Sequence, residues 1–239
     1  MNGYALVTGA SRGIGQSIAT ALAAKGYHLI LTCRNSMDTL TAFSANLATK
    51  YNITCIPKQC DMKNAEEVLR LFESITDLDI VINNAGISYV GLLQDMTPEE
   101  WNNMIATNLS SAFYTSKYAI PLMLRKHKGH IINISSVWGT VGAATEVAYS
   151  ASKGGLNSFT RALGKELAPS GIQVNALACG LIETSMNAHL TVEDLDALAE
   201  EIPAGRQGSC EEVAQAVLGL LDMPSYFTGQ IVTLDGGWT

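Results

Sequence analysis

A tyrosine and a lysine stand four positions apart in the stretch Tyr149-Ser150-Ala151-Ser152-Lys153. If this stretch is helical, the two side chains lie one turn apart on the same face. A free tyrosine has a pKa of about 10, and a fixed positive charge beside it favours the phenolate. We therefore expect Lys153 to lower the pKa of Tyr149 and the pair to act as a proton donor. The alternative is a surface tyrosine and a solvated lysine on an ordinary helix.

A second group of residues suited to binding is the glycine-rich stretch Thr8-Gly9-Ala10-Ser11-Arg12-Gly13-Ile14-Gly15. It follows an apolar run at residues 4–7 that predicts a buried strand, and it opens an alanine-rich helical pattern. Glycine permits backbone angles that other residues avoid, and it lets the main chain approach a pyrophosphate at a helix N-terminus. Strand, glycine turn and helix together predict a dinucleotide site. The alternative is a tight turn without a ligand.

The hydrophobic pattern predicts strands that alternate with helices. We expect strands at residues 4–7, 28–33, 53–59, 79–82, 131–134, 173–176 and 231–234. Helices are expected from the glycine turn to about residue 25, at 39–51, at 65–75, around Tyr149, and at 98–125 with an interruption near Asn108. This alternation predicts one Rossmann-type, doubly wound α/β sheet of about seven parallel strands with helices on both faces, in a single domain spanning residues 1–239. Its ligand should lie at the carboxyl ends of the strands.

Taken together, the motifs resemble those of the short-chain dehydrogenase/reductase family, with the closest likeness to the 3-oxoacyl-acyl-carrier-protein reductases. The resemblance covers essentially the whole chain, and Ser136 precedes Tyr149 by thirteen positions, as is usual in the family. The residues that carry it, in the family's order, are Gly9, Gly13 and Gly15, the segment Asn83-Asn84-Ala85-Gly86, Asn108, Ser136, Tyr149 with Lys153, and Asp235-Gly236-Gly237.

The resemblance implies that the protein reduces a ketone to a secondary alcohol by hydride transfer from a nicotinamide. Tyr149 would donate the proton, and Lys153 would bind the nicotinamide ribose and lower the pKa of the phenol. Ser136 would stabilise the oxyanion, and Asn108 would hold a water that links Lys153 to solvent. The implied contacts with the cofactor are made by Gly9, Ser11, Arg12, Gly13, Ile14, Gly15, Arg34, Asp61, Asn84, Ala85, Gly86, Tyr149, Lys153, Ile182 and Thr184.

The end of the second expected strand indicates which dinucleotide is bound. An acid there would accept hydrogen bonds from the adenosine ribose and select NAD, but the sequence reads Thr32-Cys33-Arg34-Asn35, and the first acid is Asp38. Arg34, together with Arg12 in the glycine turn, can form charge-assisted bonds to a 2′-phosphate, so we expect NADP(H). The alternative is that both arginines are only surface residues.

Composition limits the partners. The net charge is −7, so nucleic acid is not expected as a partner. Hydrophobic residues make up 47% of the chain and charged residues 15%, so we expect the chain to self-associate. No apolar run approaches the ~20 residues of a membrane span, and we expect neither a membrane segment nor a signal peptide. Five scattered cysteines indicate reduced thiols, no zinc site and a cytoplasmic location. The family resemblance implies a homotetramer, with a dimer as the alternative, and we expect no metal site.

Three further features concern the substrate. The cluster Arg125-Lys126-His127-Lys128 could receive an acidic acyl carrier protein, or it could be the solvated C-terminal end of a helix. Residues 183–202 resemble the family's substrate lid, and its acids suit an acidic carrier protein poorly; they include Glu193, Asp194, Asp196, Glu200 and Glu201. Cys179 stands where relatives usually have a proline, and it is either a redox-sensitive thiol or a buried, inert one.

Two alternative functions remain open. The pairs Trp138-Gly139 and Glu146-Val147 resemble reductases that act on a 5-aminopentanone group attached to a translation elongation factor. Glu146 precedes Tyr149 by three residues and could pair with a substrate ammonium, or it could simply be an acid at a helix N-terminus. The other alternative is a non-catalytic NADP-sensing protein, although such a protein needs no proton donor.

Overall fold

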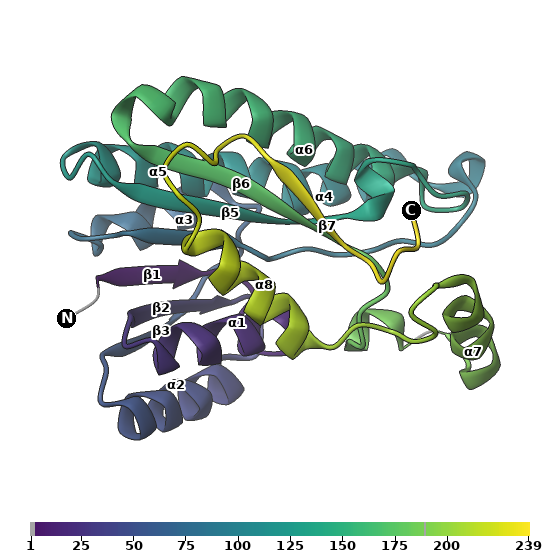
Figure 1. Ribbon diagram of the computed structural model, residues 1–239, viewed down its shortest axis with the longest axis horizontal. Coiled ribbons are helices and arrows are strands. Elements are labelled where there is room, and N and C mark those ends of the chain that lie inside the picture. Colours follow the sequence, from purple (N-terminus) through teal and green to yellow (C-terminus); the bar gives the residue numbers. More distant parts are fainter. Residues whose placement is uncertain (1–2, 189) are drawn as a thin grey trace.

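The computed structural model describes residues 3–188 and 190–239. Within these residues, a seven-stranded sheet has the order β3-β2-β1-β4-β5-β6-β7 (Figure 1). Every neighbouring pair is parallel. The predicted Rossmann-type α/β class is therefore confirmed. The strands are β1 (Tyr4–Val7), β2 (His28–Cys33), β3 (Cys55–Gln59), β4 (Ile80–Asn83), β5 (Gly129–Ser136), β6 (Ile172–Cys179) and β7 (Ile231–Leu234).

The central strands are apolar on both faces because helices cover both faces. In β1, Ala5 and Val7 pack into one hydrophobic cluster, whereas Leu6 packs into the other. All three side chains are fully buried. Since successive residues of a strand point to opposite sides, an unbroken apolar run is what a sheet covered on both faces requires.

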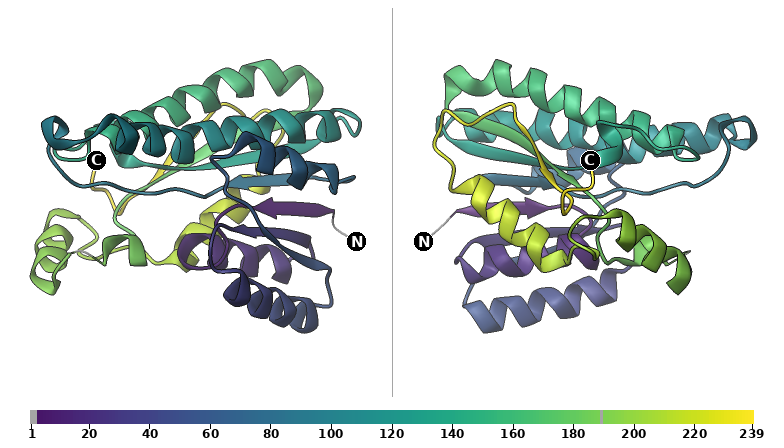
Figure 2. Two further views of the ribbon diagram at one scale, coloured as in Figure 1. Left: turned by 180° about the vertical axis from the view of Figure 1, so that it is seen from behind. Right: turned by 45° about the vertical axis from the view of Figure 1, so that its right-hand side comes forward.

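Two layers of helices enclose the sheet (Figures 1 and 2). One face carries α1 (Gly13–Ala24), α2 (Met37–Tyr51) and α8 (Cys210–Leu221). The other carries α3 (Ala65–Glu73), α4 (Pro98–Ile105), α5 (Ser111–Leu124) and α6 (Val147–Leu167). Short 3₁₀ turns lie at Leu93–Asp95, Val137–Gly139, Ala168–Ser170 and Ser185–Asn187. The part of the chain that the structure describes has no helix long and apolar enough to cross a membrane.

The long helical tract is interrupted where the sequence predicts it. Between α4 and α5, residues Ala106–Ser110 form a π-helical turn that contains Asn108. A π turn inserts one extra residue into a helix and is often found at functional sites. It turns the Asn108 side chain toward the loop that follows β4, with which it forms hydrogen bonds.

Several predicted boundaries differ from the observed ones. Strands β5 and β6 are longer than predicted because they pair with each other over eight residues each. Their polar residues, such as Asn133 and Ser135, are buried and hydrogen-bonded, which a search for apolar runs overlooks. Strand β3 begins at Cys55, two residues later than predicted. The prediction omitted α8, although Ser209 and Glu212 form a capping box at its start.

The predicted lid, residues 183–202, contains α7 (Val192–Glu201). His189, which belongs to this segment, lies outside the described residues. All residues of α7 are partly or fully exposed. Figures 1 and 2 show α7 standing away from the helical layers, on the side to which the strands point with their carboxyl ends.

Candidate active site

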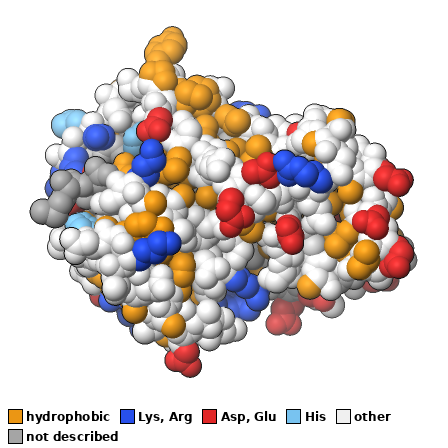
Figure 3. All heavy atoms as spheres, turned by 60° about the horizontal axis from the view of Figure 1, so that its bottom comes forward, with side chains coloured by type: hydrophobic (Ala, Val, Ile, Leu, Met, Phe, Trp, Pro, Cys, Tyr) orange, Lys and Arg blue, Asp and Glu red, His pale blue; other side chains and the backbone are white. Residues whose placement is uncertain are grey.

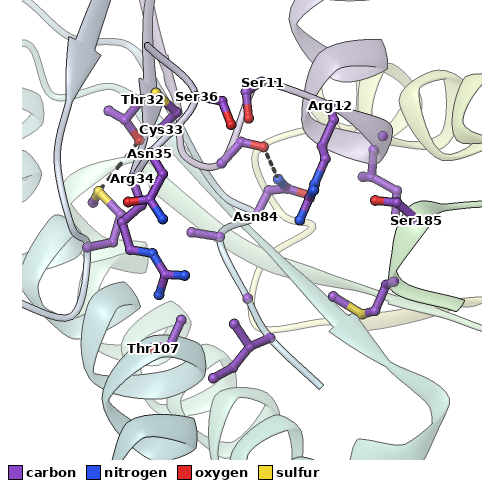
Figure 4. A pocket seen from close by; sticks show the side chains of 18 of the residues that line it. Ser11, Arg12, Thr32, Cys33, Arg34, Asn35, Ser36, Asn84, Thr107 and Ser185 are labelled. Carbon is purple, nitrogen blue, oxygen red and sulfur yellow. Dashed lines mark hydrogen bonds between the residues drawn. The ribbon is translucent and has the colours of Figure 1, made fainter. Parts of the chain in front are cut away.

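A cavity of about 510 Å³ lies at the carboxyl ends of β1, β2 and β4. Strands β1 and β4 are neighbours in the sheet, and the chain leaves them in opposite directions, so a crevice opens between them. Figure 4 shows this cavity. Of the predicted cofactor contacts, those that line it are Gly9, Ser11, Arg12, Gly13, Ile14, Arg34, Asp61, Asn84, Ala85, Gly86 and Thr184.

The glycine turn is built for close backbone approach. Gly9 has a φ of +65°, a value that favours glycine. A Cβ atom on Gly15 would lie 2.4 Å from the carbonyl oxygen of Gly9, so only glycine lets α1 begin this near the turn. The turn therefore leaves the first backbone N–H groups of α1 at the edge of the cavity, a suitable place for a phosphate. These features fit a dinucleotide.

Thr8 and Asn84 hold the glycine turn against the loop after β4. The Thr8 hydroxyl accepts hydrogen bonds from the backbone N–H groups of Asn84 at 3.0 Å and Ala85 at 2.9 Å. The Asn84 side-chain amide donates to the carbonyl oxygens of Thr8 at 2.9 Å and Gly9 at 3.1 Å. Asn84 thus supports the shape of the binding site. Sequence reasoning gave no role to Thr8, whose signal is its place between a strand and the first glycine.

Both predicted arginines belong to the cavity. Arg12 and Arg34 are exposed residues, and Figure 4 shows their guanidinium groups on two sides of the same space. Among the described lining residues, Asp61 is the one with a carboxylate. Asn35 and Ser36 line the cavity beside Arg34 and add polar groups there. The end of β2 is therefore cationic and rich in hydrogen-bond donors.

A second cavity, of about 340 Å³, continues from the first. The predicted catalytic residues Ser136, Tyr149 and Lys153 line it. A molecule that extends from the first cavity into the second therefore reaches the tyrosine and the lysine. Residues common to both cavities are Ile14, Asn84, Gly86, Ser88, Thr184 and Met186.

Lys153 lies over the face of the Tyr149 ring. Its Nζ donates to the carbonyl oxygen of Ile134 at 2.8 Å and lies 5.6 Å from the centre of the Tyr149 ring. The lysine side chain is only 5% exposed. Burial lowers the pKa of Lys153 from 10.5 to about 8.

The expected lowering of the Tyr149 pKa is wrong. Burial raises the pKa of Tyr149 above its ordinary value, and a hydrogen bond with Ser136 acts in the opposite direction with a smaller effect. The lysine, with a pKa of about 8, loses its charge before the phenol ionises. The positive charge that the prediction relied on is therefore missing at the pH where Tyr149 ionises.

Asn108 connects the π turn to the loop after β4. Its Oδ1 accepts from the backbone N–H of Ile87 at 2.8 Å, and its Nδ2 donates to the carbonyl oxygen of Ile87 at 2.9 Å. Nδ2 also donates to the Ser152 hydroxyl on α6 at 3.1 Å. A Cβ atom on Gly86 would lie 3.3 Å from Asn108 Oδ1 and 3.7 Å from Lys153 Nζ. The fold thus brings Gly86, Asn108 and Lys153 together.

Aromatic rings and an acid also line the second cavity. Trp138 and Trp238 meet edge to face with their ring centres 4.9 Å apart, and both line the cavity. Glu146 lines it as well and stands at the start of α6. Sequence reasoning missed Trp238, because its position near the chain end gives no local signal. Other lining residues that it missed include Ser88, Thr107, Ser185, Leu190 and Leu198.

Cys179 is a buried thiol at the end of β6. Burial raises its pKa to about 12. A thiol in this state is protonated and unreactive near neutral pH, so of the two interpretations the inert one fits. Among residues 3–188 and 190–239, no group of three or more His, Cys, Asp or Glu side chains is arranged to hold a metal ion.

The basic cluster lies at the wrong end of the sheet for a role beside this site. It precedes β5, whose far end carries Ser136. Lys126 forms ion pairs of 2.6 Å with both Asp77 and Asp79. Arg125 donates to the carbonyl oxygen of Thr76 at 3.3 Å. The interpretation as a solvated helix end therefore fits better than the one as a docking patch.

The lid segment, residues 183–202, itself carries acidic side chains. Figure 3 shows them gathered toward the edge of the molecule on which α7 lies in Figure 1. The acids of the segment are Glu183 and, on α7, Glu193, Asp194, Asp196, Glu200 and Glu201.

The fold and the site define a class: a Rossmann-type, nicotinamide-dependent oxidoreductase with a tyrosine and a lysine beside the cofactor cavity. The chain belongs to the short-chain dehydrogenase family, whose model, described as short chain dehydrogenase, matches residues 3–194. This confirms the family and the class of enzyme predicted from the sequence.

Individual relatives cover nearly the whole chain. An "Uncharacterized oxidoreductase YmfI" from Bacillus subtilis is 38% identical over 240 residues, covering 100% of this chain and 99% of that protein. A "3-oxoacyl-[acyl-carrier-protein] reductase FabG" from Aquifex aeolicus is 40% identical, covering 97% of this chain and 95% of its own. The Salmonella typhimurium protein of the same name is 42% identical, covering 98% of this chain and 96% of its own.

Proposed function

We propose that the protein is an NADPH-dependent reductase that converts a ketone into a secondary alcohol, and that its substrate is a 3-oxoacyl group carried on an acyl carrier protein. The observation that carries the proposal is that Ser136, Tyr149 and Lys153 line one cavity that continues from the dinucleotide cavity. The names of the relatives from Aquifex aeolicus and Salmonella typhimurium support the choice of substrate.

Each side chain then has a task that its position allows. A nicotinamide bound in the first cavity would supply the hydride for the carbonyl carbon. Ser136 donates a hydrogen bond to the carbonyl oxygen and stabilises the negative charge that develops there. Tyr149 gives its proton to that oxygen, and its raised pKa keeps it protonated near neutral pH. Lys153 would hold the nicotinamide ribose, and Asn108 would hold a water that connects Lys153 to solvent.

The preference for NADPH follows from the end of β2. Arg12 and Arg34 would bind the 2′-phosphate, with Asn35 and Ser36 as further donors. Asp61 would bind the adenine amino group. Ile182 lines the second cavity and Thr184 both cavities, in keeping with contacts to the nicotinamide amide and the phosphates.

The proposal is tested by NADPH oxidation with a panel of carbonyl compounds. The panel contains acetoacetyl-acyl-carrier protein, ethyl acetoacetate, 5-amino-2-pentanone and the uncharged 2-pentanone. We expect the carrier-bound thioester to give the highest kcat/KM. If no member of the panel is reduced, the alternative of a non-catalytic NADP-sensing protein is supported. If 5-amino-2-pentanone has the highest kcat/KM, the amino ketone is the substrate and the carrier-bound thioester is not.

A second candidate substrate is the amino ketone, the 5-aminopentanone group attached to a translation elongation factor. The observation in its favour is that Glu146, Trp138 and Trp238 line the same cavity as Tyr149. A carboxylate and aromatic faces both attract an ammonium group. The acidic lid and the distance of the basic cluster from the site also suit a cationic substrate better than an acidic carrier.

The variant Glu146→Gln separates the two substrates. If the amino ketone is the substrate, the variant loses about tenfold or more of kcat/KM for 5-amino-2-pentanone and much less for ethyl acetoacetate. Equal losses for both compounds would contradict this candidate. Glu99→Gln, an exposed acid on α4, serves as the control and should change neither value.

We also propose that the chain forms one domain over residues 1–239, works in the cytoplasm, and assembles as a homotetramer or dimer. Large apolar side chains on the outer helices support the assembly: Trp101, Phe113, Leu124 and Val147 are exposed. Sedimentation equilibrium measures the assembly directly, and a monomer at micromolar concentration would contradict it.

A further inference from the structure

Buried hydrogen bonds fasten α6 to β5 along the strand that ends in the catalytic serine. Asn133 Nδ2 donates to the Thr160 hydroxyl at 2.8 Å, and the Ser135 hydroxyl donates to Asn157 Oδ1 at 2.6 Å. All four residues are buried. Residues 133 and 135 point to the same side of the strand, and residues 157 and 160 share one face of the helix. The two bonds therefore set how far α6 lies along β5.

Such pairs add little to stability compared with apolar contacts. A buried polar group must give up its bonds to water, and a buried pair replaced by apolar groups of similar shape is often as stable. What a buried pair does provide is a single register between the elements that it joins. The polar character of Ser135 and Asn157 therefore indicates that their hydrogen bond fixes the position of α6 relative to β5.

Asn157 also reaches the segment on the other side of Ser136. Its Nδ2 donates to the Thr140 hydroxyl at 3.4 Å. A Cβ atom on Gly139 would lie 2.9 Å from the same nitrogen, so the turn packs directly on Asn157. Asn157 follows Lys153 by one helical turn on α6. One side chain therefore holds the residue before Ser136, the turn after it, and the helix that carries Tyr149.

We propose that Asn157, through Ser135 and Thr140, is a positioning residue that places the Ser136 hydroxyl against the Tyr149 hydroxyl. The inference rests on the catalytic roles proposed above for Ser136 and Tyr149. Without the bond between Ser135 and Asn157, the end of β5 shifts relative to α6, and the Ser136 hydroxyl moves relative to Tyr149, which lines the same cavity. A displacement of about 1 Å in an active site can lower the rate a hundredfold.

The test compares Ser135→Val with Ser135→Thr, two variants of nearly equal volume that differ in the hydroxyl. With ethyl acetoacetate and NADPH, we expect kcat of the Val variant to fall about tenfold to a hundredfold below that of the Thr variant. The KM for NADPH should stay within about twofold, since the dinucleotide cavity is unchanged. NMR of ring-labelled tyrosine, with Tyr149→Phe for assignment, should show a shifted Tyr149 Cζ signal in the Val variant alone.

Equal kcat values and equal NMR signals in the two variants would overturn the inference. If neither variant folds, the double variant Ser135→Ala with Asn157→Leu removes both polar partners, and the same losses and the same shift are expected relative to the wild type. Thr160→Val removes the other bridge and should lower Tm while leaving kcat within about twofold. If Thr160→Val loses as much kcat as Ser135→Val, the two hydrogen bonds between β5 and α6 act only on the structure as a whole, and the specific role of Asn157 is overturned.

The variant Tyr149→Phe distinguishes a failure of the proposed mechanism from a failure of the positioning role of Asn157. An inactive Tyr149→Phe together with a fully active Ser135→Val would overturn only the role of Asn157. An active Tyr149→Phe would overturn the proposed mechanism itself. Glu146, Lys153 and Cys179, the other charged or titratable groups near Tyr149, are unchanged in all the variants at position 135.

Discussion

Lys153 approaches Tyr149 from the face of its ring, with Nζ 5.6 Å from the ring centre. Its hydrogen bond goes instead to the carbonyl oxygen of Ile134. The pair that the sequence singles out is therefore close, with the ammonium over the ring and its hydrogen bond directed to the backbone. Lys153 is buried and Tyr149 is partly buried, and the pKa of each is shifted toward its neutral form.

Lys153→Met should stabilise the protein at neutral pH. The pKa of Lys153 in the folded protein, about 8, is below its ordinary value of 10.5, so the folded state binds fewer protons between these two pH values. The destabilisation by the buried charge is thus complete below about pH 8 and is relieved as the pH rises toward 10.5. The gain from Met, on the order of a few kcal/mol at most, should shrink over the same range. Urea unfolding at several pH values measures it.

Two results would contradict the explanation by a buried charge. One is a gain in the free energy of unfolding of Lys153→Met that stays constant from pH 7 to pH 10, and the other is a variant less stable than the wild type at pH 7. The comparison is made against the wild type at each pH, because Tyr149 and Cys179 titrate in both proteins.

Tyr149→Phe should abolish turnover while the protein still binds NADPH. The change removes the proton donor and leaves the dinucleotide cavity in place. We expect kcat to fall about a hundredfold to ten-thousandfold, with little change in the dissociation constant for NADPH measured by fluorescence. Tyr118→Phe, on the outer helix α5, is the matched control. Activity within a few-fold of the wild type would refute the assignment.

Arg34→Ala should remove the preference for NADPH over NADH. A charge-assisted bond to a phosphate is worth about 1.5–3 kcal/mol, so the KM for NADPH should rise roughly tenfold to a hundredfold. The KM for NADH should hardly change, since NADH has no 2′-phosphate. Initial rates with both dinucleotides measure this, with Arg161→Ala on α6 as the control. A similar rise for NADH would mean that Arg34 has another role.

Gly15→Ala should destabilise the protein and weaken dinucleotide binding. The added Cβ would lie 2.4 Å from the Gly9 carbonyl oxygen and 2.5 Å from the Asn84 amide nitrogen. Relieving such overlap costs about 1–3 kcal/mol and moves the turn. The matched control is Gly219→Ala in α8, where no described atom outside the helix lies within 4 Å of the new Cβ. There we expect a gain of about 0.5–1 kcal/mol. Thermal unfolding with and without NADPH compares them, and equal effects would contradict the packing argument.

Much of the fold could be predicted because it depends on neighbours in the chain. Apolar runs separated by helical patterns identified the seven strands that the structure contains within its described residues. The interruption at Asn108 was predicted and is a π turn. Helix α8 was omitted although its capping box is a local signal. The lengths of β5 and β6 depend on pairing between distant segments, which a local pattern does not contain.

The sequence alone determined which residue types are present for the chemistry: a tyrosine and a lysine one helical turn apart, a glycine turn between strand and helix, and arginine where an acid would select NAD. Such features are local, since they follow from the spacing along one strand, turn or helix. Tertiary structure decided which distant groups meet. Thr8 supports Asn84 from 76 positions away, and Trp238 joins Trp138 at the cavity. It also decided the direction of each pKa shift, because burial depends on all the segments packed around a group.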